Sequence, residues 1–420
     1  MSSAPGYALQ SPTRRYLEKD CKTDWGYIVE CLRPDPAHVA GAEYGYPHRV
    51  LLRAREHWLA GHIHARLGRS GKCIRLDAAR EQDVDGKMQG PMWLYFSFAL
   101  GLFMYQTMDN VDGKQARRTG TSSGLGELFD HGIDSLNCTL GSLLETASMG
   151  LGTTPAGVFT ALCPCLPMFF STWETYHTHT LYLGYFNGPT EGILIACAVM
   201  AISGVYGPDL WTQPLALLVK DRFPEFADTL GDTNFLDIWI VIIVGSLVTG
   251  HVPFCVYNVV RARRAQGLPV APVFLEWTPM VIYTVSIGAW AFSPHSTLME
   301  ENHLVLFCLT LSFVFGRMTT KMILAHLTRQ PFPYWTHMLT PLVGGAIIGN
   351  LPVFGYTKIS AEVELAYLWA YFVFAMVVYF RWAYLVITSI CNFLGINALT
   401  IPKEKQIANQ KALEAAKKAQ

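Results

Sequence analysis

Long apolar segments, each able to cross a lipid bilayer as a helix, recur along the chain between residues 91 and 393. A membrane-spanning helix needs about 20 predominantly apolar residues, and it tolerates Gly and Pro better than a soluble helix does. Nine segments fit this description: 91–108, 135–151, 156–173, 190–206, 235–258, 273–292, 303–325, 334–350 and 365–393. The hydrophobic pattern therefore predicts an all-α, polytopic membrane bundle of about nine spans.

The polar segments between these spans separate by charge. Lys and Arg mark the cytoplasmic loops of membrane proteins. Basic clusters follow odd-numbered spans, at Lys114/Arg117/Arg118, Arg261/Arg263/Arg264, Lys321/Arg329 and in the tail after Pro402. The acid-rich segments 207–234 and 294–302 follow even-numbered spans. Counting spans puts every basic cluster on one side, so residues 109–134 are predicted to face the cytosol.

Residues 1–87 differ from the rest of the chain, because they contain no long apolar run. Nine spans would also place this segment on the opposite side of the membrane from the C-terminus. We therefore divide the chain into an anomalous N-terminal segment (1–87), a membrane domain (88–400) and a charged cytosolic tail (401–420). We expect that a first span is missing ahead of Met88 and that 1–87 is not the functional N-terminus.

Composition supports the membrane assignment and argues against other classes of protein. Of the 420 residues, 51% are hydrophobic and 15% are charged, whereas soluble proteins carry about 25% charged residues. The formal net charge is zero, so no overall positive field would attract nucleic acid. The ten cysteines are scattered, mostly within apolar runs, which is typical of buried, reduced thiols.

Residues 109–134, DNVDGKQARRTGTSSGLGELFDHGID, place four aspartates just beyond the first apolar span. On a helix, Asp109 and Asp112 lie one turn apart on one face, and Gly113 and Ala116 continue that face. Two carboxylates followed by two small residues form an acidic surface with room for a ligand. Single aspartates at a membrane interface often only cap helices, but four at helix-face spacing indicate a binding site.

A second acidic helix face follows a turn rich in Gly, Ser and Thr. Glu127, Asp130, His131 and Asp134 repeat the spacing on this helix. Because the turn is short, we expect the two helices to be antiparallel neighbours with facing acidic surfaces. Four aspartates in one small site repel one another unless cations neutralise them, and oxygen ligands favour Mg²⁺ or Mn²⁺. We predict a pair of such ions, the usual arrangement for in-line displacement at phosphorus.

The pattern Asp-x2-Asp-Gly-x2-Ala-Arg-x8-Gly-x3-Asp-x3-Asp over residues 109–134 resembles the complete signature of the CDP-alcohol phosphotransferase family. The strings QTMDNVDGKQARRT, WETYHTHTLYLG (173–184) and KMILAHLT (321–328) are similar to the eukaryotic choline/ethanolamine phosphotransferase branch. The resemblance covers about residues 88–400. It implies a helical membrane bundle of about ten spans, usually dimeric, that moves a phospho-alcohol from a CDP-alcohol to a lipid hydroxyl. The family's first span, with a nucleotide-holding Ala-Pro-Asn element, has no counterpart in residues 1–90.

The resemblance also implies which residues form the site. It implies that four aspartates bind the metal ions: Asp109, Asp112, Asp130 and Asp134. It implies that five further residues contact the CDP-alcohol: Gly113, Ala116, Arg117, Gly126 and Glu127. The small residues would let the cytidine diphosphate approach closely, and the guanidinium group would hold phosphate oxygens.

Two residues are candidates for the base that removes the proton from the acceptor hydroxyl. Asp134 would be a poor base when bound to Mg²⁺, because the cation stabilises its anionic form. His131 has an ordinary pKa of about 6.5, which suits general-base catalysis at neutral pH. His131 is also the proton acceptor that the resemblance implies, so we favour it over Asp134.

We expect transfer of phosphocholine or phosphoethanolamine from CDP-choline or CDP-ethanolamine to diacylglycerol, on endoplasmic reticulum or Golgi membranes with the active site in the cytosol. Lys417 and Lys418 resemble a dilysine retrieval signal for the endoplasmic reticulum. One alternative is another CDP-alcohol enzyme, which would use CDP-diacylglycerol with inositol or serine. Another is a cation transporter, although transport sites usually lie near the membrane midplane and the motif lies at one edge of a span.

Several polar residues outside the motif are further candidates. They are two histidine pairs and three charged residues within spans: His62/His64, His177/His179, Glu145, Arg317 and Lys321. The histidine spacing allows metal binding, but hydrogen bonding at the membrane surface explains the second pair better. A charged residue within a span is a functional candidate by default, and a buried contact with a neighbouring helix is the competing interpretation for Glu145. Arg317 and Lys321 are expected either to extend to the membrane surface or to contact phosphate.

Overall fold

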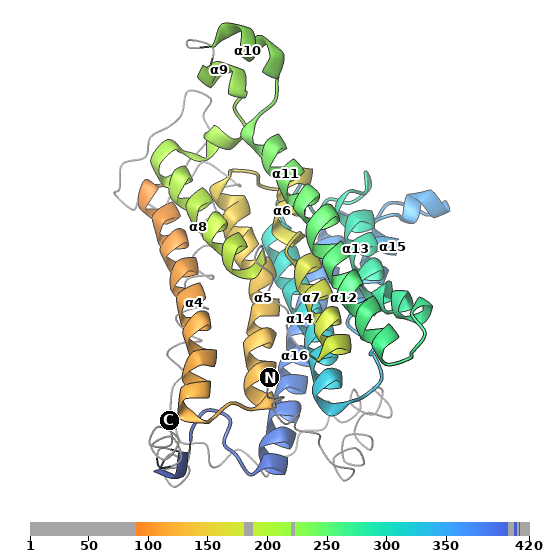
Figure 1. Ribbon diagram of the computed structural model, residues 1–420. Coiled ribbons are helices and arrows are strands. Elements are labelled where there is room, and N and C mark those ends of the chain that lie inside the picture. Colours follow the sequence, from red (N-terminus) through yellow and green to blue (C-terminus); the bar gives the residue numbers. More distant parts are fainter. Residues whose placement is uncertain (1–89, 180–187, 220–222, 402–406, 410, 412–420) are drawn as a thin grey trace.

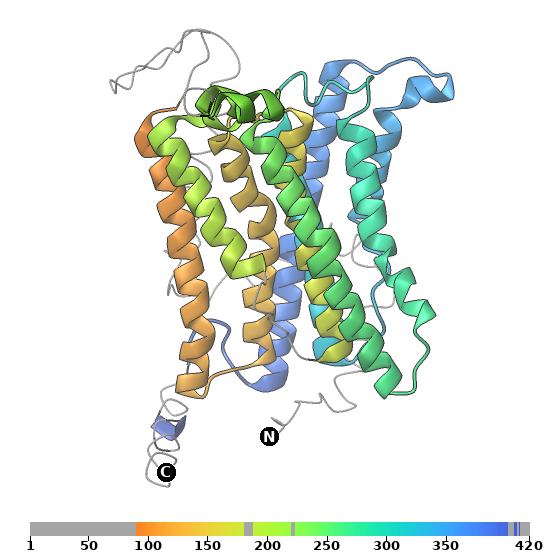
Figure 2. The ribbon, with the colours of Figure 1, turned by 45° about the horizontal axis from the view of Figure 1, so that its top comes forward.

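The structure is a computed structural model, which describes residues 90–179, 188–219, 223–401, 407–409 and 411. In this part of the chain, long helices run side by side as a bundle, without β-strands (Figures 1 and 2). The α-helices are α4 (Met92–Thr119), α5 (Gly124–Ser148), α6 (Pro155–Leu162), α7 (Cys165–Thr178), α8 (Gly188–Tyr206), α9 (Leu215–Val219), α10 (Pro224–Leu230), α11 (Phe235–Gly245), α12 (Val252–Ala265), α13 (Thr278–Ala291), α14 (Leu304–Thr328), α15 (Leu339–Ile348) and α16 (Ala361–Leu394). Four shorter segments accompany them: η1 (Pro208–Trp211), η2 (Ser246–His251), η3 (Ala271–Trp277) and η4 (Leu351–Phe354).

Each predicted apolar segment falls on one or more of these helices. Among the described residues, four helical stretches are long and apolar enough to cross a membrane: Pro155–Thr178, Phe235–Ala265, Leu304–Thr328 and Ala361–Leu394. The most apolar of them, Phe235–Ala265, is also the least buried, with only 6% of its apolar window inside the protein. Apolar surface on this scale is expected where a helix faces lipid. The prediction of an all-α, polytopic membrane protein is confirmed.

Prolines explain where the helices break or begin. Pro164 separates α6 from α7, and Pro253 at the start of α12 follows the π-helical turn η2. A proline has no N–H to donate to the preceding turn, so the helix ends or widens there. Pro331 and Pro333 lie in the non-helical segment that follows α14, and α15 begins at Leu339 instead of the predicted residue 334.

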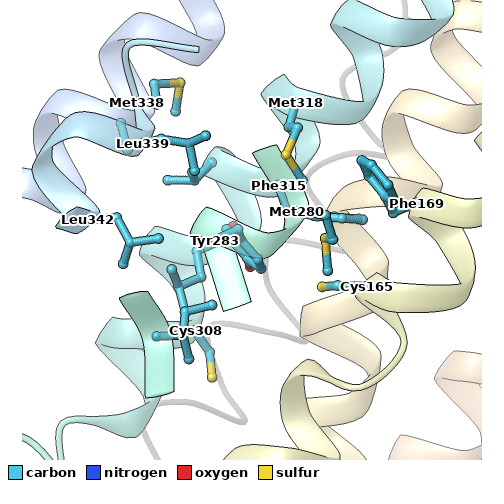
Figure 3. Close-up of a cluster of buried hydrophobic side chains, with 14 of the residues drawn as sticks. Cys165, Phe169, Met280, Tyr283, Cys308, Phe315, Met318, Met338, Leu339 and Leu342 are labelled. Atoms are coloured by element: carbon cyan, nitrogen blue, oxygen red, sulfur yellow. The ribbon is translucent and has the colours of Figure 1, made fainter. Parts of the chain in front are cut away.

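Helix α14 lies at the centre of the bundle, where it packs against α5, α7 and α16. Its apolar side chains form the main core together with those of α7, α13 and α15. Figure 3 shows Phe315 of α14 in this core near Phe169 of α7 and Tyr283 of α13. These three side chains are at most 1% exposed. The core therefore holds the helices that surround the acidic motif.

Close packing against α14 fixes α5, which carries the second half of the motif. A Cβ atom on Gly132 would lie only 3.2 Å from the methyl carbon of Thr320. One turn away, the hydroxyl of Thr319 donates a hydrogen bond of 2.7 Å to the hydroxyl of Ser135. Small and hydroxylated residues let membrane helices approach closely. The rotation of α5, and with it the direction of its acidic face, is set by α14.

The ends of the helices separate the basic and acidic segments. The motif, the C-terminal end of α12 and the C-terminal end of α14 lie at one end of the bundle, and α9 and α10 lie at the other (Figures 1 and 2). Arg263 and Arg264 in the last turn of α12 and Arg329 after α14 are therefore at the motif's end, as the span count predicts. The predicted segment 1–87, with its histidine pair, and the two C-terminal lysines of the proposed retrieval signal lie outside the described residues.

Candidate active site

The acidic motif occupies the adjoining ends of α4 and α5. Helix α4 ends at Gly120, whose φ of 66° is left-handed, a conformation that glycine adopts without strain. Ser123 caps α5, because its hydroxyl accepts a 3.2 Å hydrogen bond from the backbone N–H of Gly126. Residues 120–123 thus reverse the chain, and α4 and α5 run antiparallel (Figure 1). The short turn that the sequence predicts is confirmed.

Three of the four predicted ligand carboxylates converge. Asp109 and Asp112 of α4 and Asp130 of α5 each offer an oxygen, and these oxygens all lie within 4.8 Å of one another. We refer to these three residues as the aspartate cluster. Asp109 and Asp130 are half-buried and Asp112 is exposed, so the cluster is open to solvent. Its donors are all carboxylate oxygens, the ligands that Mg²⁺ and Mn²⁺ prefer.

Repulsion within the aspartate cluster favours binding of a cation. Asp109 and Asp130 both lie outside the apolar segments of α4 and α5, at the ends where the two helices adjoin. Burial, followed by the charges of Asp134 and Asp130, raises the pKa of Asp109 to about 8. Burial and the charge of Asp134 also raise the pKa of Asp130. A divalent cation would offset the cost of ionising these groups together, so the cluster fits a cation in its donors and in its electrostatics.

Asp134 contacts one residue on each helix. Its Oδ1 accepts a hydrogen bond from the hydroxyl of Tyr105 on α4, and its Oδ2 lies 3.6 Å from Nδ1 of His131 on α5. Burial alone would lower the pKa of His131, but the interaction with Asp134 and the charges of Asp130 and Glu127 together outweigh it, and the pKa is raised. Tyr105 is not part of the sequence motif. Tyr105 nevertheless lies four residues before Asp109, which puts the two residues on the same helix face. Helical periodicity could therefore have identified Tyr105 from the sequence.

A second polar group adjoins Glu127, where α7 and α14 end. Nε2 of His326 lies 3.9 Å from a carboxylate oxygen of Glu127, and its ring stacks on that of His179 with 4.9 Å between centroids. Nη1 of Arg329 lies 3.2 Å from Nε2 of His179. Burial and the neighbouring Arg329 lower the pKa of His179. These residues come from helices far apart in sequence, and no local pattern predicts their contact.

The small residues of the motif leave open surface beside the carboxylates. A Cβ atom on Gly113 would meet only the guanidinium group of Arg117, at 3.6 Å or more, and one on Gly126 would meet only the hydroxyl of Ser123, at 3.7 Å. Packing of the described residues therefore requires neither glycine. Ala116, which lies between the two glycines in the sequence, is half-buried, and Arg117 is exposed in the last turn of α4. This arrangement agrees with a surface that a ligand approaches closely.

Two of the candidates outside the motif, His177 and Arg317, contact residues on other helical segments. Nε2 of His177 lies 2.6 Å from a carboxylate oxygen of buried Glu276, so His177 and His179 do not face a common ligand. The guanidinium carbon of Arg317 lies 4.0 Å from the centre of the Trp382 ring, a cation–π contact between α14 and α16. Both contacts join residues on different helical segments of the bundle.

Similarity to known proteins provides evidence about the family of this chain that is independent of the geometry of the site. A profile of the CDP-alcohol phosphatidyltransferase family matches residues 89–218. Cholinephosphotransferase 1 of Saccharomyces cerevisiae is 33% identical over 335 residues, which cover 76% of this chain and 81% of the yeast protein. Choline/ethanolaminephosphotransferase 1 of the same yeast is 30% identical over 353 residues, covering 83% and 88%. Choline/ethanolaminephosphotransferase 1 of Arabidopsis thaliana is 32% identical over 321 residues, covering 75% and 80%.

Similarity of this extent, over most of each relative's length, agrees with the helical fold and with the spacing of the motif. The chain belongs to the CDP-alcohol phosphatidyltransferase family. It is therefore an integral membrane transferase of phospholipid biosynthesis, and its chemistry is CDP-alcohol phosphotransfer. Members of the family depend on divalent cations, and the aspartate cluster has the donors for one.

Proposed function

We propose that the protein transfers phosphocholine or phosphoethanolamine from CDP-choline or CDP-ethanolamine to diacylglycerol. The products are phosphatidylcholine or phosphatidylethanolamine and CMP. The main support is the convergence of the aspartate cluster at the joined ends of α4 and α5, in a chain whose relatives are named as choline and ethanolamine phosphotransferases. A group of carboxylates suits a diphosphate donor, because cations held there offset the charge that otherwise repels an attacking hydroxyl.

The aspartates would hold the cations. Asp109, Asp112 and Asp130 would bind one Mg²⁺ or Mn²⁺, and Asp134, one turn beyond Asp130 on α5, would contribute to a site for a second ion. When bound, these ions neutralise the diphosphate and the charge that develops on the leaving CMP. The proposal requires no thiolate or imidazole ligand, in keeping with the preference of both ions for oxygen.

The adjoining helix ends would also hold the CDP-alcohol. Gly113, Ala116 and Gly126 would form the surface along which the cytidine diphosphate approaches, and the two glycines have open space beside them. Arg117 presents a planar set of N–H donors that matches phosphate oxygens in pairs. Glu127, in the first turn of α5, would contact the CDP-alcohol from the other helix.

His131 would accept the proton from the diacylglycerol hydroxyl. Its Nδ1 faces Asp134, so Nε2 is the nitrogen that can take a proton from the substrate. As the proton moves to Nε2, the hydroxyl oxygen bonds to the phosphorus that bears the choline or ethanolamine. The bond between that phosphorus and the oxygen of CMP breaks, and Asp134 stabilises the imidazolium that forms. Asp134 is the alternative base.

The reaction would take place at the boundary between membrane and cytosol. The water-soluble nucleotide would reach the exposed side of the aspartate cluster, and diacylglycerol would arrive laterally between helices. We place residues 88–400 in the catalytic domain and 401–420 in a cytosolic tail, and we propose a homodimer in the endoplasmic reticulum or Golgi. Recovery of a tagged protein in mitochondria or at the plasma membrane would contradict this location.

Product analysis tests the proposed substrates. Purified protein in diacylglycerol-containing vesicles is supplied with Mg²⁺ and either CDP-choline or CDP-ethanolamine, and vesicles without diacylglycerol serve as the control. We expect CMP and the matching phospholipid in equal amounts, only when diacylglycerol is present. A parallel arm supplies CDP-diacylglycerol with inositol or serine. Product in that arm alone would contradict the proposed donor and acceptor, and the absence of product from every arm would contradict the function.

A further inference from the structure

One side-chain contact joins α4 to α5 near the aspartate cluster without belonging to the family signature. The hydroxyl of Tyr105 on α4 donates a hydrogen bond to Oδ1 of Asp134 on α5. The oxygen of Tyr105 is also hydrogen-bonded to the side chain of Asn137, one turn further along α5. Helix α4 otherwise packs mainly against α8. The Tyr105 contact therefore ties α4 directly to the helix that carries His131.

Asp134 extends this contact to His131. One of its oxygens accepts the Tyr105 hydrogen bond, and the other lies 3.6 Å from Nδ1 of His131. A carboxylate beside one ring nitrogen sets the tautomer and orientation of a histidine, and leaves the other nitrogen to act as the base. Without the Tyr105 hydroxyl, the Asp134 carboxylate is free to rotate about its terminal bond. His131 would then lose the group that orients it.

We infer that Tyr105 is a positioning residue of the transfer reaction, which holds Asp134 so that Asp134 holds His131 with Nε2 toward the acceptor hydroxyl. The inference rests on the proposed role of His131 as the base. The hydroxyl of Tyr105 bonds to Asp134, which is not one of the three residues of the aspartate cluster. Loss of this hydroxyl should therefore slow the reaction without weakening the binding of the CDP-alcohol or of the cation at the aspartate cluster.

Tyr105→Phe removes the hydroxyl and keeps the ring. With the CDP-alcohol and acceptor that the wild type uses, we expect kcat to fall about 10- to 100-fold, the effect of losing one hydrogen bond to a charged group. KM for the CDP-alcohol should stay within about twofold of the wild type. Tyr367→Phe is the matched control, because the Tyr367 hydroxyl donates to the backbone oxygen of Pro341 at 2.7 Å, and it should keep wild-type kcat.

A double-mutant cycle separates positioning from a general effect on the fold. Because Tyr105 acts through His131, Tyr105→Phe should lower kcat little further in a His131→Ala protein. An equal loss of kcat in both backgrounds would overturn the inference. So would wild-type kcat in Tyr105→Phe, or a raised Mg²⁺ requirement with kcat intact, which would assign the hydroxyl to the cation site. A wild type without any transfer activity would instead contradict the proposed function, and the inference with it.

Discussion

Replacement of Asp130 by alanine is expected to lower CMP release by about 10³-fold or more, because several kcal/mol of charge stabilisation are lost with the cation. Asp109→Ala should have the same effect. The protein should remain folded, since α5 is fixed to α14 by Gly132 and Ser135 rather than by its aspartates. Rates of CMP release and thermal unfolding of the purified variants measure both parts of this prediction.

The stability of Asp130→Ala provides a sharper test of the cation site. The charge of Asp130 contributes to the raised pKa of Asp109. A carboxyl group whose pKa is raised in the folded state destabilises the protein when it ionises. For Asp109 this destabilisation grows as the pH rises from 3.8, the ordinary pKa of the group, toward about 8, its pKa in the folded protein. In a chelating buffer at pH 8, Asp130→Ala should therefore unfold at or above the wild-type temperature. Asp232→Ala, an exposed residue between α10 and α11, is the control and should keep wild-type activity. Near-normal activity of Asp130→Ala would contradict the cation site.

Replacement of His131 by alanine is expected to lower kcat by about 10²- to 10⁴-fold, the usual contribution of a general base. Binding of the CDP-alcohol should change little, because His131 is not among its proposed contacts, which are Gly113, Ala116, Arg117, Gly126 and Glu127. Single-turnover rates and equilibrium binding of CDP-choline, measured on the same preparation, separate the two effects.

Variants of other residues show whether the loss is specific to His131. His295→Ala, in the loop between α13 and α14, should keep wild-type kcat. If His131→Ala loses CDP-alcohol binding but keeps kcat, His131 positions the nucleotide, and Asp134 becomes the candidate base. That result would also remove the basis for a positioning role of Tyr105.

The convergence of the aspartate cluster could be predicted from sequence because it depends on local geometry. Asp109 and Asp112 share a helix face by their spacing alone, and the short turn at Gly120 brings Asp130 opposite them. The same reasoning predicts the helices, since each span is a continuous apolar segment. Predicted and observed ends differ where proline interrupts a helix, as at Pro164.

Contacts between helices distant in sequence could not be predicted in this way. Periodicity shows which face of α4 carries Tyr105, but the partner of its hydroxyl depends on the relative height of α4 and α5. The stacking of His326 on His179 depends on where α14 and α7 end in space. The relative height of two helices is set by side-chain packing throughout the core. It cannot be read from the sequence of any one segment.

The measurement that tests the account most directly is CMP release by purified protein as a function of divalent cation. The protein is treated with a chelator, transferred to diacylglycerol-containing vesicles with CDP-choline or CDP-ethanolamine, and titrated with Mg²⁺ or Mn²⁺. We predict no CMP without added cation, full activity on addition of either ion, and no recovery for Asp130→Ala at any concentration tested. Undiminished CMP release in the presence of excess chelator would contradict a cation-dependent reaction at the aspartate cluster.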